Sequence, residues 1–116
     1  VAASDDQIYY VDYSEGRVGR LNPATGKVRE WVSPSGSGSG PYAMAVDAKD
    51  RLWYVETGVT PNKLIGFSPK SGEFISQTEI PSGGGSVRHM VYGPKSNSIW
   101  FGTDRGTIGQ ARLGTN

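Results

Sequence analysis

The stretch Leu52–Glu56, with the sequence Leu-Trp-Tyr-Val-Glu, decides the fold of this chain. Its aromatic and β-branched residues, with turn-forming residues on both sides, are typical of a short β-strand. The same pattern returns as Ile-Tyr-Tyr-Val-Asp at Ile8–Asp12 and as Ile-Trp-Phe-Gly-Thr at Ile99–Thr103, at spacings of 44 and 47 residues. Repeats of about 40 to 50 residues that each carry several short strands indicate the blades of a β-propeller.

Turn signals divide the chain into three repeat units of one partial domain, at approximately residues 1–40, 41–85 and 86–116. Two Pro-x-x-Gly turns, Pro23–Gly26 and Pro69–Gly72, occupy the same place in the first and second units. The expected strands are 8–13, 17–22, 27–32, 42–46, 52–56, 63–68, 73–80, 87–92, 99–103 and 107–113. We therefore predict an all-β chain of about two and a half four-stranded antiparallel blades, a partial propeller, since closed propellers start at about four blades.

The segment 33–40 alternates serine and glycine and has the composition of an interdomain linker. The repeat phase runs straight through it, however, and the corresponding segment of the second unit, 81–86, is also rich in glycine. A loop between blades therefore explains both segments better than a linker does.

The composition agrees with many short strands and turns. The chain has 116 residues, 17 glycines and 7 prolines, and 35% of its residues are hydrophobic. Its 12 basic and 11 acidic residues are scattered along the chain and give a formal net charge of +1. This balance offers no electrostatic attraction to nucleic acid or to an anionic membrane, and we expect neither as a partner.

Several site chemistries are excluded by missing residues. The chain has no cysteine, so it has no disulfide, no thiolate nucleophile and no cysteine-based zinc site. It also lacks a phosphate-binding loop, a calcium loop and a Gly-x-Ser-x-Gly elbow. No apolar run approaches the roughly 18 to 20 residues that span a bilayer. Because the chain starts at Val1 without a methionine, we expect a processed or truncated product, with a periplasmic or secreted location.

The order of the repeated pieces resembles the streptogramin B (virginiamycin B) lyase-like propellers. The pieces are an aromatic strand that ends in an acid, an Ile/Val-Gly pair, a Pro-x-x-Gly turn and a Gly-Pro-aromatic start. They stand here as Leu52–Glu56, Val18–Gly26, Gly40–Tyr42 and Ile108–Gly109, and the similarity covers nearly the whole chain. The resemblance implies that this chain forms the C-terminal part of a longer, closed propeller.

The resemblance also implies a chemistry, in which a cyclic depsipeptide is opened by elimination at its ester bond with help from a bound magnesium ion. In that family a histidine of an innermost strand acts as the general base. His89 is the single histidine and falls within the expected innermost strand 87–92, so it is our candidate catalytic residue. Magnesium is the expected cofactor of the complete propeller, and its ligands stay open.

Two departures from the family pattern bear on this hypothesis. When the inner strands are aligned on Met44 and Met90, Arg88 takes the place that follows the usual proline, and His89 comes one residue later. The third copy of the strand pattern ends in Thr103, with Asp104 one step beyond it. The metal-binding carboxylate that the resemblance implies there is therefore displaced or absent.

Arg88, Tyr42 and Glu56 are our candidate ligand-binding residues, and each candidate has a structural alternative. His89 is otherwise a hydrogen-bonded histidine of a tight strand. Arg88 either contacts an anionic ligand or pairs with a carboxylate such as Glu56 or Asp104. Glu56 stands at a repeated acid position, which favours a contact between blades. We expect Trp31, Trp53 and Trp100 to pack between blades, with a stacking platform for a sugar or aromatic ligand as the alternative.

Two functions remain open for the complete protein. One is a lyase-like or lactone-opening enzyme to which this chain contributes His89 and Glu56, the fragment alone being inactive. The other is a non-catalytic propeller that binds a small-molecule ligand or a protein. In both, the open wedge leaves unpaired strand edges, so we expect either the remainder of a longer propeller chain or a homo-oligomer.

Overall fold

The computed structural model describes residues 1–114, which form ten β-strands and no helix. The strands are β1 (Ile8–Asp12), β2 (Arg17–Leu21), β3 (Val28–Val32), β4 (Pro41–Val46), β5 (Leu52–Glu56), β6 (Lys63–Ser68), β7 (Glu73–Glu79), β8 (Met90–Gly93), β9 (Ser98–Gly102) and β10 (Ile108–Arg112). Residues 115 and 116, the end of the third expected unit, lie outside this description. Within residues 1–114 there is no helix of the length and hydropathy needed to cross a membrane.

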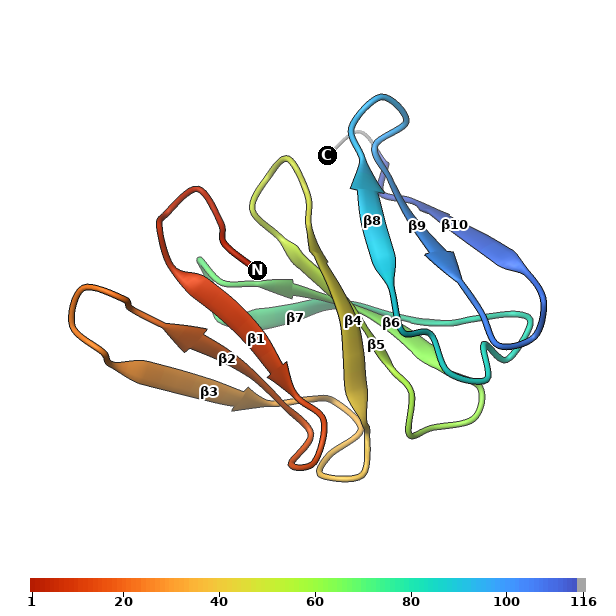
Figure 1. Ribbon diagram of the computed structural model, residues 1–116, viewed down its shortest axis with the longest axis horizontal. Coiled ribbons are helices and arrows are strands. Elements are labelled where there is room, and N and C mark those ends of the chain that lie inside the picture. Colours follow the sequence, from red (N-terminus) through yellow and green to blue (C-terminus); the bar gives the residue numbers. More distant parts are fainter. Residues whose placement is uncertain (115–116) are drawn as a thin grey trace.

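The strands form three antiparallel sheets, β1-β2-β3, β4-β5-β6-β7 and β10-β9-β8. This confirms the predicted all-β class and the division into three, four and three strands. Figure 1 shows the sheets fanned side by side, with the β4–β7 sheet in the middle. The inner strand β4 contacts both β1 and β8, so each outer sheet packs against one face of the middle sheet.

The middle sheet is buried on both faces, which explains why every residue of β5 is buried. Successive side chains of a strand point to opposite faces. Leu52 and Tyr54 accordingly join one apolar cluster with Tyr9 of β1, while Trp53 and Val55 join a second cluster with Phe101 of β9. The continuous run of hydrophobic residues at 52–55 therefore belongs to one strand that contributes side chains to two apolar cores, one on each face of its sheet.

The Ile/Val-Gly pairs of the sequence have a packing role, because the aromatic ring of one strand lies across the glycine of the next. Three pairs of this kind cross between neighbouring strands: Tyr10 with Gly19, Trp53 with Gly66 and Phe101 with Gly109. A Cβ atom added at Gly109 would lie 2.2 Å from two atoms of the Phe101 ring, which is far inside van der Waals contact. Only glycine leaves room for the ring at this position.

A second repeated feature is a left-handed residue two positions before the first residue of the strand pattern, which is Ile8, Leu52 or Ile99. Asp6, Asp50 and Asn97 have φ angles of 62°, 57° and 48°. Aspartate and asparagine adopt this conformation more readily than other residues with a Cβ atom, because their short polar side chains form local hydrogen bonds. These residues are a repeat marker that the sequence analysis did not use.

The structure corrects the start of the third inner strand. The prediction was a strand over 87–92, but β8 begins at Met90. Val87 is fully buried, and its backbone N–H donates to Oδ1 of Asn62 at 3.3 Å. A contact with the middle sheet's loop thus takes the place of a ladder hydrogen bond, and His89 lies in the loop just before the strand.

Candidate functional site

One end of the three sheets gathers the ends of β1, β5 and β9 and the starts of β4 and β8, at the lower edge of Figure 1. We call the loops at this end, residues 13–16, 33–40, 57–62, 81–89 and 103–107, the rim. Backbone hydrogen bonds join these loops: Ser33 N–H to Gly16 O at 2.8 Å, Gly58 N–H to Ser39 O at 2.8 Å and Asp104 N–H to Gly84 O at 3.2 Å. The rim is therefore a continuous structure that spans all three sheets.

Tyr42 and Arg88 occupy the same repeat position at the rim. Met44 pairs with Tyr54, and Met90 pairs with Phe101, which is the same residue of the strand pattern in the next sheet. The two methionines are therefore equivalent, and Tyr42 and Arg88 each lie two positions before one of them. Both side chains are exposed. The start of β4 and the loop just before β8 thus present an aromatic ring and a guanidinium group at matching places of the repeat.

The phenol ring of Tyr42 has a partner from the first sheet. Tyr13, which follows β1, meets it edge to face, with the ring centroids 5.9 Å apart and the planes at 82°. Edge-to-face pairs of this kind hold aromatic rings in a defined orientation. The two tyrosines therefore form an aromatic surface between the first and second sheets.

Arg88 pairs with Asp104, one of the two carboxylates that the sequence analysis named. Its Nη1 atom lies 3.0 Å from the Asp104 carboxylate, and the two side chains are 56% and 44% exposed. At this exposure an ion pair is worth about 0–1 kcal/mol. A ligand with its own acceptor oxygens can therefore compete for the guanidinium.

His89 is exposed beside this pair. A shallow cavity of about 240 Å³ is lined by Ser86, Arg88, His89, Gly102, Thr103 and Asp104. The structure therefore brings two of the sequence candidates, Arg88 and His89, to one place, and Tyr42 lies at the equivalent place of the neighbouring sheet.

Glu56 is separated from these residues by its burial. Its Oε2 atom accepts hydrogen bonds from Ser33 Oγ at 2.6 Å and Ser35 N–H at 2.9 Å, and its Oε1 atom accepts one from Ser35 Oγ at 2.7 Å. The side chain is completely buried. Its hydrogen bonds join the end of β5 to the loop that follows β3 of the first sheet. This is a contact between blades, the structural alternative to ligand binding by Glu56.

Tyr54 belongs to the same network, since its hydroxyl lies 2.6 Å from Ser33 Oγ. Burial raises the pKa of the Tyr54 phenol, and the negative charge of Glu56 raises it further against the opposing effect of the Ser33 hydrogen bond. The phenol stays protonated, and because Ser33 Oγ donates its proton to Glu56, the Tyr54 hydroxyl is the donor to Ser33 Oγ. This network fixes the position of β5 against the first sheet.

The residues that the structure describes do not form a magnesium site by themselves. Among residues 1–114 there is no group of three or more His, Asp or Glu side chains that converge on a common point. The carboxylate of Glu56 is occupied by three hydrogen bonds, and that of Asp104 by Arg88. Magnesium prefers several oxygen ligands in octahedral geometry, which these engaged carboxylates do not supply.

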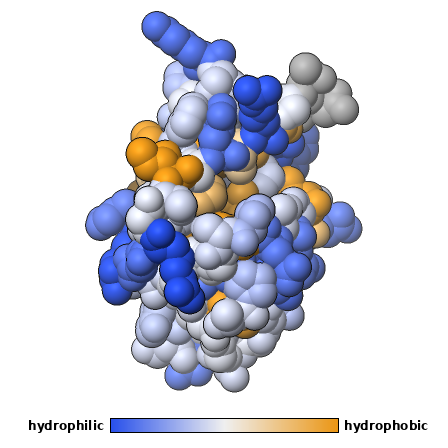
Figure 2. Space-filling view, turned by 90° about the vertical axis from the view of Figure 1, so that its right-hand side faces the viewer, coloured by the Kyte–Doolittle hydropathy of each residue, from blue (hydrophilic) through white to orange (hydrophobic). Residues whose placement is uncertain are grey.

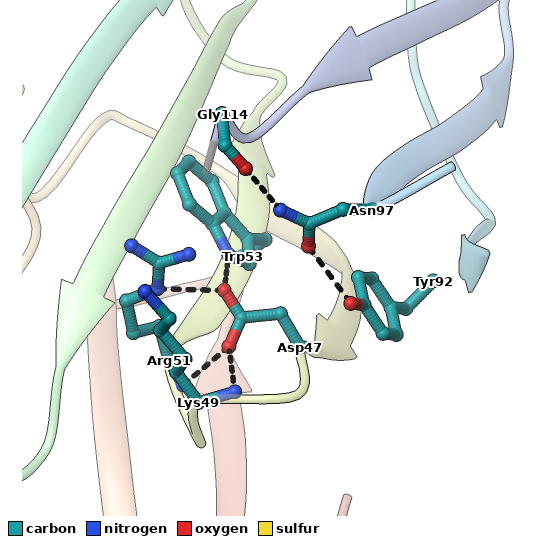
Figure 3. A network of polar contacts seen from close by, with 7 residues as sticks. All are labelled: Asp47, Lys49, Arg51, Trp53, Tyr92, Asn97 and Gly114. Carbon is teal, nitrogen blue, oxygen red and sulfur yellow. Dashed lines mark hydrogen bonds and ion pairs between the residues drawn. The ribbon is translucent and has the colours of Figure 1, made fainter. Parts of the chain in front are cut away.

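Another polar network lies at the opposite end of the sheets and was missed by the sequence analysis, which treated 47–51 only as a turn. Figure 3 shows the Asp47 carboxylate hydrogen-bonded to Lys49, Arg51 and Trp53 of its own turn and strand. Its Oδ1 atom accepts the N–H groups of Lys49 and Arg51 at 2.9 and 3.0 Å. Its Oδ2 atom accepts Arg51 Nε at 2.7 Å and Trp53 Nε1 at 2.9 Å. An acid followed by tryptophan six residues later is the signal that marks this network.

The electrostatics of Asp47 follow from these contacts. Burial raises the pKa of the carboxyl, but the hydrogen bonds from Trp53, Arg51 and Lys49 outweigh burial and leave the pKa below its ordinary value. Figure 3 also shows a second network, which lies within the third sheet. There Tyr92 donates to Asn97 at 2.8 Å, and Asn97 donates to the carbonyl of Gly114. These turns stabilise the fold and leave the rim as the candidate site.

No protein-family model matches the chain, and no curated protein matches it by sequence. Among the solved structures with a similar fold, virginiamycin B lyase from Staphylococcus aureus has a TM-score of 0.76 and 21% identity, over 99% of this chain and 40% of the lyase. A streptogramin B lyase has a TM-score of 0.72 and 25% identity, over 98% of this chain and 39% of the lyase. A luciferin-regenerating enzyme has a TM-score of 0.67 and 18% identity, over 88% of this chain and 35% of the enzyme. The chain is thus a partial β-propeller that spans at most about 40% of the length of these structures.

Proposed function

We propose that this chain supplies three blades of a ligand-binding propeller and that the rim is part of its ligand site. The observation that carries the proposal is that Tyr42, near the start of β4, and Arg88, in the loop just before β8, stand at one repeat position and are both exposed. Their partners lie at the rim, where Tyr42 meets the ring of Tyr13 and Arg88 pairs with the exposed Asp104. An aromatic ring and a guanidinium group are therefore both accessible to a ligand at the rim.

The chemistry of these side chains favours an organic ligand that combines a flat apolar group with carbonyl or carboxylate oxygens. The paired rings of Tyr13 and Tyr42 offer apolar surface with a polar tip. Arg88 offers several N–H donors in a planar arrangement that suits oxygen acceptors. Its present partner Asp104 is half-exposed and is readily replaced by a ligand oxygen.

Lyase activity is the second candidate, and the likeness to the two lyase structures favours it. In this reading His89 takes a proton from the substrate as general base, and Arg88 stabilises the negative charge that develops on the leaving oxygen. Magnesium, if the complete propeller uses it, takes its ligands from blades beyond this chain. The activity is accordingly a proposal for the complete protein and not for these three blades.

The test uses a streptogramin B depsipeptide as the probe. Binding is measured by tyrosine and tryptophan fluorescence, and ring opening by chromatography, because elimination gives an open-chain isomer of unchanged mass. We expect Tyr42→Ala and Arg88→Ala each to weaken binding about tenfold, which corresponds to about 1.4 kcal/mol. Lys70→Ala, an exposed change at the far turn, is the control.

Three outcomes are informative. Binding that depends on Tyr42 and Arg88 without ring opening supports the ligand-binding propeller. Ring opening by a longer chain, lost in His89→Ala, supports the lyase. Binding that neither Tyr42→Ala nor Arg88→Ala weakens contradicts the rim as the ligand site.

A further inference from the structure

A cavity of about 640 Å³ lies between the first and middle sheets, at the end opposite the rim. Figure 2 shows hydrophobic patches among polar side chains on another side of the molecule, where the third sheet lies. The cavity has a different character, because four of its eight lining residues are basic: Arg20, Lys49, Arg51 and Lys70. They come from β2, from the turn between β4 and β5, and from the turn after β6. Basic residues that are scattered along the sequence therefore meet in the fold.

The two carboxylates at this cavity, Asp5 and Asp50, are held by donors of the protein. Asp50 accepts the backbone N–H of Ser4 at 3.1 Å and also the Ser4 hydroxyl, which ties the facing turns of the two sheets together. Asp5 accepts the N–H of Gln7 and the hydroxyl of Tyr9, both at 2.9 Å. The ion pairs within residues 1–114 include neither carboxylate. The cavity thus keeps an excess of positive charge.

Arg20 and Lys49 are likewise absent from the ion pairs of the described residues. Arg20 is half-buried in the first sheet, and Lys49 is exposed in a turn of the middle sheet. Arg51 differs from them, because its Nε atom is bound to Asp47 at 2.7 Å. Arg20 and Lys49 therefore offer N–H donors to a ligand from both sheets.

Arg20 also has a second guanidinium group beside it. Arg29 is its direct partner across the β2–β3 ladder, and the Cζ atoms of Arg20 and Arg29 lie 5.6 and 4.8 Å from the centroid of the Trp31 ring. Like charges directly opposite each other on neighbouring strands are destabilising. The face of the indole offsets part of this repulsion. A bound anion would offset more of it, which favours a ligand-binding role for Arg20.

We propose that the cavity binds a small phosphate ester, with Arg20 and Lys49 contacting its phosphate oxygens. Near neutral pH a phosphate monoester carries about 1.5 to 2 negative charges and offers acceptor oxygens. Guanidinium and ammonium groups are donors only, and arginine presents its N–H groups in a fork that suits phosphate geometry. Pockets for small organic ligands measure about 300–1,000 Å³, so this cavity also has room for the organic part of an ester. The proposal does not depend on the ligand site at the rim.

The experiment is a titration of the isotope-labelled 116-residue chain with phenyl phosphate, a simple phosphate ester, followed through the NMR chemical shifts of the backbone amides. We expect the largest shifts in the turns at 3–6, 47–51 and 68–72, which surround the cavity. Arg20→Gln and Lys49→Gln should each weaken binding about tenfold, the usual effect of losing a hydrogen bond between charged groups. Inorganic phosphate should bind more weakly than phenyl phosphate, because it lacks the organic group.

Lys95→Gln is the matched control, since it removes one exposed positive charge from the corresponding turn of the third sheet. It should change the affinity by less than about twofold, because salt screens a distant exposed charge. Lys49 is exposed, so Lys49→Gln tests the proposal even if Arg20→Gln fails to fold, which its amide spectrum would reveal. An absence of saturable shifts at these turns, or equal weakening by Lys95→Gln and Lys49→Gln, would overturn the proposal. Equal affinity for inorganic phosphate would refute the ester and assign the cavity to the free anion.

Discussion

The indole N–H of Trp53 donates to Oδ2 of Asp47 at 2.9 Å, and this bond ties the middle strand of the central blade to the turn that precedes it. Trp53 also lies over Gly66 on the next strand and joins the apolar cluster against the third sheet. One side chain thus links a turn, a strand pair and the contact between blades. The polar network around Asp47 should therefore matter to the whole fold.

Asp47→Asn should lower the free energy of unfolding by about 1.5–3 kcal/mol, because a neutral amide replaces a carboxylate that accepts charge-assisted hydrogen bonds. The NH₂ group of the new asparagine would also face an N–H donor of Arg51 or Trp53 or one of the backbone donors. Urea denaturation measures the change. Asp104→Asn removes an exposed ion pair and should cost less than about 1 kcal/mol. Equal losses in the two variants would contradict the special role of Asp47.

Stability should also fall in acid because of Asp47. Its pKa in the folded state lies below the ordinary value of 3.8, so the unfolded chain takes up the proton first. The stabilisation is complete above the ordinary pKa and is lost as the pH falls through the folded pKa. Denaturation series between about pH 6 and pH 2 should show this loss, and Asp47→Asn should flatten it. An unchanged acid limb in the variant would assign the loss to other carboxylates.

The three-four-three strand pattern could be predicted because flanking turns mark the strands and the repeated aromatic pattern marks the central strand of each unit. The start of β8 could not, since Val87 bonds to Asn62, and no local pattern records a hydrogen bond from a loop of another sheet. For the same reason the sequence left two partners open for Arg88, and only the fold brings it to Asp104. Tertiary contacts decide where β8 begins and which carboxylate pairs with Arg88, and the local periodicity of the sequence carries no information about such contacts.

Gly109→Ala should destabilise the third sheet, because the new methyl group would overlap the ring of Phe101. Overpacking of this kind costs about 1–3 kcal/mol. Gly102→Ala is a matched control in the neighbouring strand, where an added Cβ meets no atom within 4 Å. Thermal unfolding of the two variants should therefore differ clearly. Similar melting temperatures would show that the Phe101 ring moves aside freely.

Glu56→Gln separates the two roles that the sequence left open for this residue. Three donors from Ser33 and Ser35 point at the carboxylate, so one of them would face the NH₂ group of glutamine in a buried place. We expect a loss of about 1–3 kcal/mol in the free energy of unfolding, the usual penalty of an unsatisfied buried polar group. Binding of a streptogramin B probe at the rim should change less than about twofold, since burial keeps Glu56 away from the exposed Arg88. Glu73→Gln, an exposed change in β7, controls for the charge. Unchanged stability with lost binding would instead assign Glu56 to the ligand site.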